Sequence, residues 1–193
     1  MPSPVPLSIK LTVLTVIMSE HIVSFMMPTI VVYMVERLGH YNSAQVSDFQ
    51  SVSYWVGLLE GANRLFALFG GIIWGAISDR IGRKASLMYI ITGIGLSSLG
   101  VGLSTSLYSI LCWRVLAGFL AGTIPITKAL MRDLSDDSNI SVLYSYFGTG
   151  YGAASIIGPL VGGLLSSPRE SSSVLFSNSI ISTFPYLYPF LIQ

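Results

Sequence analysis

Between Gly75 and Ala85 the chain reads GAISDRIGRKA, a short charged stretch that lies between two long apolar runs. A charged segment of about ten residues in this setting is typical of a tight loop that joins two membrane helices. Gly82 supplies the backbone freedom that a sharp reversal needs. Because cations mark cytoplasmic loops, we expect this loop on the cytoplasmic side of a membrane. Its defining residues are Gly75, Asp79, Arg80, Gly82, Arg83 and Lys84.

The composition of the chain supports a membrane environment. Of its 193 residues, 52% are hydrophobic and 10% are charged, whereas soluble domains carry about 25% charged residues. A chain of this size could not hide so much apolar surface from water, so we expect the lipid bilayer as its surroundings. The formal net charge of +1 gives no field that attracts nucleic acid. The single cysteine, Cys112, excludes an internal disulfide, and no cysteine and histidine spacing predicts a metal or cofactor site.

Hydrophobic length predicts how often the chain crosses the bilayer. A spanning helix needs about 20 predominantly apolar residues. Six segments meet that requirement, so we predict one all-α membrane domain over residues 1–193, a bundle of six transmembrane helices. The predicted helices cover residues 9–35, 53–77, 85–103, 107–130, 141–165 and 174–193.

The distribution of basic residues predicts the orientation of this bundle. With the N-terminus inside, only Arg37 and Arg169 lie in outer loops. Cytoplasmic loops of membrane proteins carry an excess of lysine and arginine, so we expect both termini in the cytoplasm. The predicted cytoplasmic cations are Lys10, Arg80, Arg83, Lys84, Lys128 and Arg132.

Three patterns resemble signatures of the major facilitator superfamily, a large family of secondary transporters. The hairpin pattern G-x-x-x-D-R-x-G-R-K is similar to the family's signature loop between its second and third helices. Arg114, Gly118 and Gly122 resemble its second signature, R-x-x-x-G-x-x-x-G. A glycine-rich helix ending in G-P-x-x-G-G resembles the antiporter signature of proton-driven exporters. That third pattern comprises Gly150, Gly158, Pro159, Gly162 and Gly163.

The first apolar run carries a further resemblance. Its Ser19-Glu20-His21-Ile22 stretch is similar to the A-E-P-I sequence that zinc-induced facilitator-like proteins of fungi and plants often carry there. His21 stands where that group has proline, which is a departure from the pattern of the group.

The family resemblance implies a fold and a function. The chain matches the N-terminal six-helix half of a facilitator, so the missing C-terminal half or another copy would be its partner. In the family, the residue matching Asp79 pairs with that matching Arg83 and latches the outward-facing state. The resemblance implies secondary active transport of a small solute, with proton-coupled export by alternating access in a vacuolar or plasma membrane. It implies no enzyme activity. The alternative is a truncated, non-transporting subunit or regulator that associates with a full-length transporter.

Ionisable residues within the apolar runs are the candidates for proton coupling and the substrate path. A charge at the bilayer centre costs about 2.5–3.5 kcal/mol on insertion scales, so such residues usually face a water-filled path or a partner. Glu20 lies near mid-membrane, where a carboxyl that exchanges between neutral and charged forms is a candidate proton carrier. The alternative is a neutral glutamate bonded to a neighbouring helix. The full candidate set is Glu20, His21, Glu60, Asn63, Arg64 and Arg114.

Two ion pairs are expected among these candidates. Glu60 and Arg64 are four residues apart and share a helix face, which predicts a pair within the second helix. By resemblance, Arg114 occupies the family position that is implicated in proton coupling, and we expect it to pair with Glu20.

Small residues at intervals of four predict one close helix contact. Gly150, Ala154, Gly158 and Gly162 fall on one face of the fifth predicted helix. A stripe of this kind allows another helix to approach closely.

Overall fold

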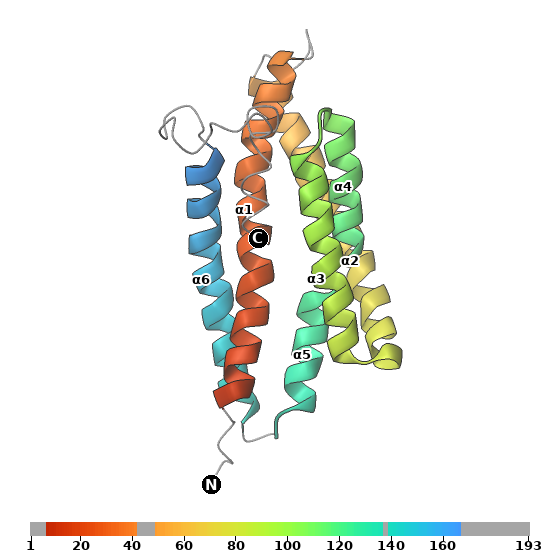
Figure 1. Cartoon of the computed structure of the whole chain (residues 1–193), viewed down its shortest axis with the longest axis vertical. Coiled ribbons are helices and arrows are strands. Elements are labelled where there is room, and N and C mark those ends of the chain that lie inside the picture. Colours follow the sequence, from red (N-terminus) through yellow and green to blue (C-terminus); the bar gives the residue numbers. More distant parts are fainter. Residues whose placement is uncertain (1–6, 42–48, 137–138, 167–193) are drawn as a thin grey trace.

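The computed structural model describes residues 7–41, 49–136 and 139–166, and within these ranges it contains helices and no strand. Successive helices run in opposite directions along the long axis, with α4 and α5 forming one pass in two pieces (Figure 1). The helices are α1 (Leu7–Tyr41), α2 (Phe49–Ile81), α3 (Arg83–Gly102), α4 (Leu107–Phe119), α5 (Thr123–Asp133) and α6 (Ile140–Ser166).

Four stretches of the described chain are long and apolar enough to cross a membrane: Leu7–Leu38, Gln50–Ile81, Arg83–Gly102 and Leu107–Asp133. They correspond to the first four predicted spans. The fifth predicted span coincides with α6, but that helix does not reach the same hydropathy because glycine, serine and tyrosine interrupt its apolar residues. The sixth, over residues 174–193, lies outside the described residues. The chain is a multi-pass membrane protein, and the count of six spans stays a prediction.

The turn between α2 and α3 consists of one residue. Gly82 alone separates the two helices, with φ +93 and ψ 149, a backbone conformation that glycine adopts without steric penalty. Asp79 and Arg80 therefore lie in the last turn of α2, and Arg83 and Lys84 in the first turn of α3. The predicted loop of about ten residues is wrong, because no residue before Gly82 interrupts the helix.

The predicted helix over residues 107–130 corresponds to one candidate membrane span, but it is not continuous, because it breaks between α4 and α5. α4 ends at Phe119 and α5 begins at Thr123. Pro125 has no N–H to donate to the carbonyl of Ala121, and its ring crowds that carbonyl, which disfavours a continuous helix at this point. The break lies in the middle of a candidate membrane span.

The glycine stripe of α6 packs against α1, as predicted. A Cβ atom at Gly158 would lie 2.7 Å from the carbonyl oxygen of Ile22 and 2.7 Å from Cβ of Phe25. One at Gly162 would lie 2.9 Å from Cγ of Met26, and Ala154 between them is fully buried. The other two members of the antiporter-like motif point elsewhere: Pro159 is exposed, and a Cβ at Gly163 would meet nothing within 4 Å.

Two glycines of α6, Gly158 and Gly163, are expected to change the free energy of unfolding in opposite directions when replaced by alanine. Gly158→Ala places a methyl group against the backbone of α1 and should lower the free energy of unfolding by about 1–3 kcal/mol. Gly163→Ala has open space and should raise it by about 0.5–1 kcal/mol through helix propensity. Thermal unfolding in detergent measures both variants. Equal effects would contradict the helix contact described here.

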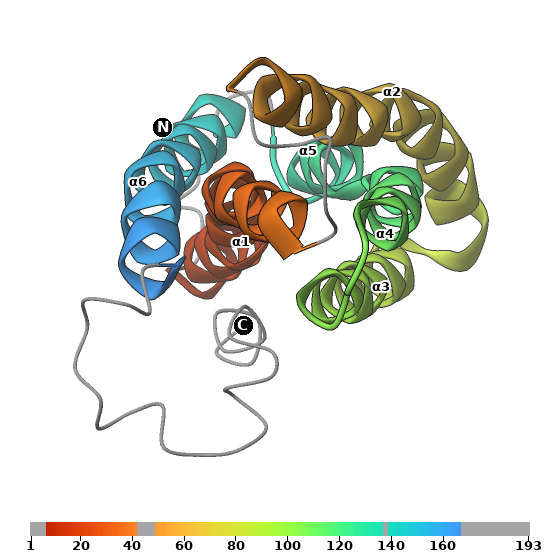
Figure 2. The same ribbon diagram turned by 90° about the horizontal axis from the view of Figure 1, so that it is seen from above.

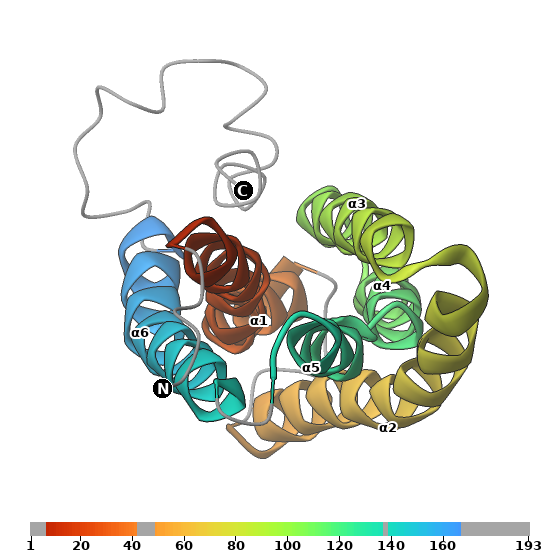
Figure 3. The same ribbon diagram turned by 90° about the horizontal axis from the view of Figure 1, so that it is seen from below.

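Apolar clusters fill the two ends of the bundle, and polar side chains gather between them among apolar ones. One cluster joins the second half of α1 to the start of α4 and includes Ile30, Met34 and Ile110. A second joins the start of α1 to α5 and α6 near the α2–α3 turn, through Ile17 and Met131. α2 arches across the outer side of α4 and α5 when the bundle is seen along its axis (Figures 2 and 3). The helices thereby surround a central cavity between the apolar ends.

Candidate functional site

A cavity of about 270 Å³ lies at the middle of the bundle and is lined by residues from all six helices. Five of the six predicted transport residues line it, and Glu60 joins them through its bond to Arg114. The sequence prediction thus selected side chains that come together in space. The five that line the cavity are Glu20, His21, Asn63, Arg64 and Arg114.

Arg114 on α4 forms an ion pair with Glu60 on α2. Nη2 of Arg114 donates to Oε1 of Glu60, and Nδ2 of Asn63 donates to the Arg114 carbonyl at 2.9 Å. The predicted pair between Glu60 and Arg64 is therefore wrong. Arg114 is only 4% exposed and requires a counter-ion, whereas Arg64 is exposed at the cavity.

Glu20 has no arginine partner, so its predicted pairing with Arg114 is also wrong. Its Oε2 atom is buried, and the hydroxyl of Thr123 lies within hydrogen-bonding reach of the carboxyl. The nearest cation candidate is the neighbouring His21, whose Nδ1 lies 3.8 Å from that oxygen. The Glu20 side chain is 12% exposed and lines the cavity. Its carboxyl is therefore placed to accept a proton or a cationic group from the cavity.

His21 is held in place by its own helix and by α6. A carbonyl can only accept, so the 2.9 Å contact between His21 Nδ1 and the Ile17 carbonyl places a hydrogen on Nδ1. The ring of Tyr151 packs edge-on against His21 at 4.9 Å and against Phe25 at 5.2 Å between centroids. These contacts fix the imidazole and give the cavity an aromatic wall.

Thr123 belongs to the cavity but was not found from the sequence. It is the first residue of α5, is 1% exposed, and its hydroxyl lies within hydrogen-bonding reach of the Glu20 carboxyl. Nε of Arg114 is also buried, and it has no hydrogen-bond partner in the described chain. The available signal was the order Gly122-Thr-Ile-Pro125, which ends one helix, begins another and leaves a polar side chain at the junction.

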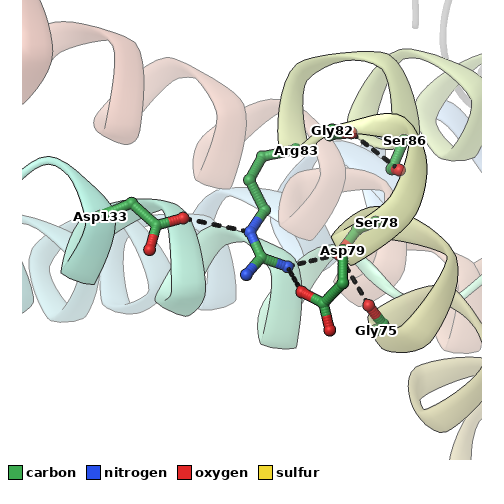
Figure 4. Close-up of polar contacts among 7 residues, drawn as sticks. All are labelled: Gly75, Ser78, Asp79, Gly82, Arg83, Ser86 and Asp133. Carbon is green, nitrogen blue, oxygen red and sulfur yellow. Dashed lines mark hydrogen bonds and ion pairs between the residues drawn. The ribbon is translucent and has the colours of Figure 1, made fainter.

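A second polar cluster lies at the end of the bundle with the α2–α3 turn (Figure 4). Nη1 of Arg83 lies 2.6 Å from Oδ1 of Asp79 and donates to Oγ of Ser78, also at 2.6 Å. Nε of Arg83 donates to Oδ2 of Asp133 at 3.2 Å. One guanidinium therefore connects α2, α3 and α5. The Asp79–Arg83 pair is the one that the family resemblance implies, whereas Asp133 was missed because its place at the end of α5 depends on tertiary packing.

The other predicted cytoplasmic cations of the described chain lie toward the same end of the bundle. α1 begins there, α2 ends there, α3 begins there and α5 ends there (Figure 1). Arg80 and Lys84 are exposed at the turn, Lys10 lies in the first turn of α1, and Arg132 in the last turn of α5. Lys128 lies further along α5, 5.6 Å from the ring centroid of Phe147.

Comparisons with known proteins place the chain among transporters. Residues 11–190 match the family model described as Major Facilitator Superfamily. The multidrug resistance protein MdtG of Yersinia enterocolitica is 32% identical over 158 residues, which are 82% of this chain and 36% of that protein. A major facilitator-type transporter of Psilocybe cubensis is 31% identical over 150 residues, 77% of this chain and 29% of that protein. MdtG of Salmonella paratyphi A is 28% identical, over 98% of this chain and 46% of that protein. The chain spans less than half the length of these relatives.

Proposed function

The chain belongs to the major facilitator superfamily, and on that premise we propose that it forms the N-terminal half of a proton-coupled exporter of small solutes. Transport by such a unit moves a solute without changing it chemically, so the proposal includes no catalytic step. The more specific resemblance to the zinc-induced facilitator-like group stays a prediction.

The observation that carries the proposal is the buried carboxyl of Glu20 at the wall of the central cavity, which forms no ion pair with a lysine or arginine of the described chain. An acid that faces a cavity at membrane depth can take up a proton there or bind a solute. If a proton and the solute compete for Glu20, each conformational change carries either the proton or the solute across the membrane. This competition produces antiport. Arg114 is bonded to Glu60, so it does not hold Glu20 in its charged form.

Alternating access is supported by the cluster around Arg83. This guanidinium ties α3 to the ends of α2 and α5, so these three helices move as a unit at that end. The unit would rock against a second set of helices around the central cavity. We propose that this set comes from a C-terminal half or from another copy of the chain, and that Asp79 and Arg83 latch one of the two states.

The clustering of cations at one end of the bundle supports a cytoplasmic location for that end and for the N-terminus. The proposed setting is a vacuolar or plasma membrane, with protons and a small solute as the transported species.

The function is tested with the purified full chain in liposomes that contain the pH dye pyranine. Small cations, anions and zwitterions, with ethidium among them, are added outside in turn. We expect at least one solute to cause a change in internal pH that requires the protein. The absence of any such change, with protein that unfolds cooperatively, would contradict independent transport and favour the alternative of a non-transporting subunit or regulator.

Arg83→Gln is expected to stop solute-dependent proton movement while changing stability little. The ion pairs of Arg83 involve acids that are 64% and 55% exposed, and exposed pairs contribute about 0–1 kcal/mol. Lys84→Gln is the matched control, since Lys84 is the adjacent cation and is exposed. Proton movement and thermal unfolding are measured for both. Unchanged proton movement in the Arg83→Gln variant would contradict the proposed role of Arg83 as a latch.

A further inference from the structure

Buried hydrogen-bonding groups of both kinds, acceptors and donors, lie around the central cavity. Oε2 of Glu20 is a buried acceptor, and the hydroxyl of Thr123 lies within hydrogen-bonding reach of the Glu20 carboxyl. Nε of Arg114 is a buried donor without a partner among the described residues. A buried polar group without a full set of partners is unfavourable, and an acid and a guanidinium in this state at one cavity indicate a ligand that supplies the missing partners.

The charges at the cavity are also separated by sign. Arg114 is paired with Glu60, which leaves only the His21 ring, 3.8 Å away, near the acid of Glu20. Arg64 lines the cavity and forms no ion pair within the described part of the chain. The cavity therefore presents an acid from α1 and a guanidinium from α2 that do not neutralise each other.

The first turn of α5 strengthens the positive side. α5 begins at Thr123, and both Thr123 and Ile124 line the cavity. The N-terminus of a helix carries a partial positive charge and favours anionic groups. The N-cap residue of α5 is Gly122, which has no side chain to accept a hydrogen bond from the first N–H groups of the helix. An anionic group would thus find a helix N-terminus and the Nε of Arg114 at one cavity.

The remaining wall is apolar and leaves room for the body of a small molecule. Phe25 and Tyr151 form an aromatic edge contact on one part of it. Small side chains line another part and create the open volume, among them Ala67, Gly71, Ala117 and Ala121.

Resting on the transport function proposed above, we infer that the solute is a small zwitterion with an aromatic or otherwise apolar body. Its ammonium group binds Glu20, beside the hydroxyl of Thr123, and its anionic group binds Arg64 and Nε of Arg114. A solute with only a positive charge leaves the donors unpaired, and one with only a negative charge leaves Glu20 unpaired. Only a solute with both charges satisfies the whole cavity.

Three probes that share a phenylethyl group test the inference: phenylalanine is zwitterionic, phenethylamine is a cation and 3-phenylpropionate is an anion. Binding of each radiolabelled probe to the purified full chain is measured at neutral pH. We expect phenylalanine to bind at least about tenfold more tightly than either single-charge probe, because each charged hydrogen bond adds affinity. Equal or tighter binding of phenethylamine or 3-phenylpropionate overturns the inference, as does binding of none of the three.

Two threonines on α5 provide a matched pair of variants. Thr123 and Thr127 are each 1% exposed, but only Thr123 lines the cavity, where its hydroxyl lies within reach of the Glu20 carboxyl. Thr123→Val should weaken the binding of phenylalanine by about tenfold, because the hydroxyl no longer positions that carboxyl, and Thr127→Val should leave the binding unchanged. Equal effects of the two variants contradict the site.

The pyranine assay separates this inference from the transport function. Proton movement driven by ethidium or phenethylamine, without any preference for phenylalanine in binding, contradicts only the zwitterion. Preferential binding of phenylalanine without proton movement for any solute contradicts the transport function and leaves the binding site in place.

Discussion

Glu60→Gln is expected to lower the free energy of unfolding by about 3 kcal/mol, because it leaves the guanidinium of Arg114 buried without its counter-ion. Arg114 is 4% exposed, and Glu60 is the acid that it contacts. Nε of the same guanidinium already lacks a partner, so no second acceptor in the described chain compensates. The Glu60 side chain is 20% exposed, which places the effect at the lower end of the range of about 3–5 kcal/mol for broken buried pairs.

Thermal unfolding in detergent, followed by tryptophan fluorescence, measures this loss. The double variant Glu60→Met with Arg114→Met should recover most of the stability, because it removes both charges together. Arg64→Met should change stability little, since Arg64 is exposed and forms no ion pair in the described chain. If Arg64→Met were as damaging as Glu60→Gln, the pair within α2 would be the real one.

Glu20→Gln is expected to abolish solute-driven proton movement while the protein stays folded. Glutamine has nearly the same size as glutamate, but its amide cannot take up and release a proton. Glu20 has no ion pair with an arginine or lysine in the described chain, so its replacement strands no buried guanidinium. The variant should therefore unfold close to the temperature of the unaltered protein.

Glu36→Gln provides the control for this experiment, since Glu36 lies on the same helix and is exposed. Its proton movement should match that of the unaltered protein. The solute is supplied in excess, so that weaker binding by the Glu20 variant does not imitate a loss of coupling. Proton movement in the Glu20 variant at the unaltered rate would exclude Glu20 as the proton carrier.

Features that depend on local sequence were predicted well. Hydrophobic length located the first four spans and the region of α6, although the fourth span is divided into α4 and α5, and spacing by four identified the α6 face that packs on α1. Gly82 was recognised as the point of reversal because only glycine readily adopts its backbone conformation. The side of the membrane and the sixth predicted helix stay predictions.

The pairing of charges between helices could not be predicted in the same way. Glu60 and Arg64 satisfy the local rule for an ion pair, yet Glu60 contacts Arg114, which is 54 residues away. The choice depends on the rotation of α2 and α4 about their axes and on their relative height, which sequence spacing does not specify. Asp133 as a partner of Arg83 depends on packing in the same way.

The break between α4 and α5 was only partly predictable from the sequence. Pro125 and Gly122 were visible signals of an interruption, but the apolar run continues through them, and hydrophobic length took precedence. The consequence was that Thr123 was read as part of a helix interior and not as the start of a helix at the cavity.

The single-residue turn at Gly82 also makes the length of this region as important as its composition. Loops of membrane proteins commonly accept tags and insertions, but here one added residue within the last turn of α2 would rotate everything after it by about 100°. Arg83 would then no longer face Asp79, its partner at the end of α2. An epitope or a fluorescent protein should therefore not be inserted within residues 75–85. We also expect homologous proteins to differ in the residues of this stretch more readily than in its length.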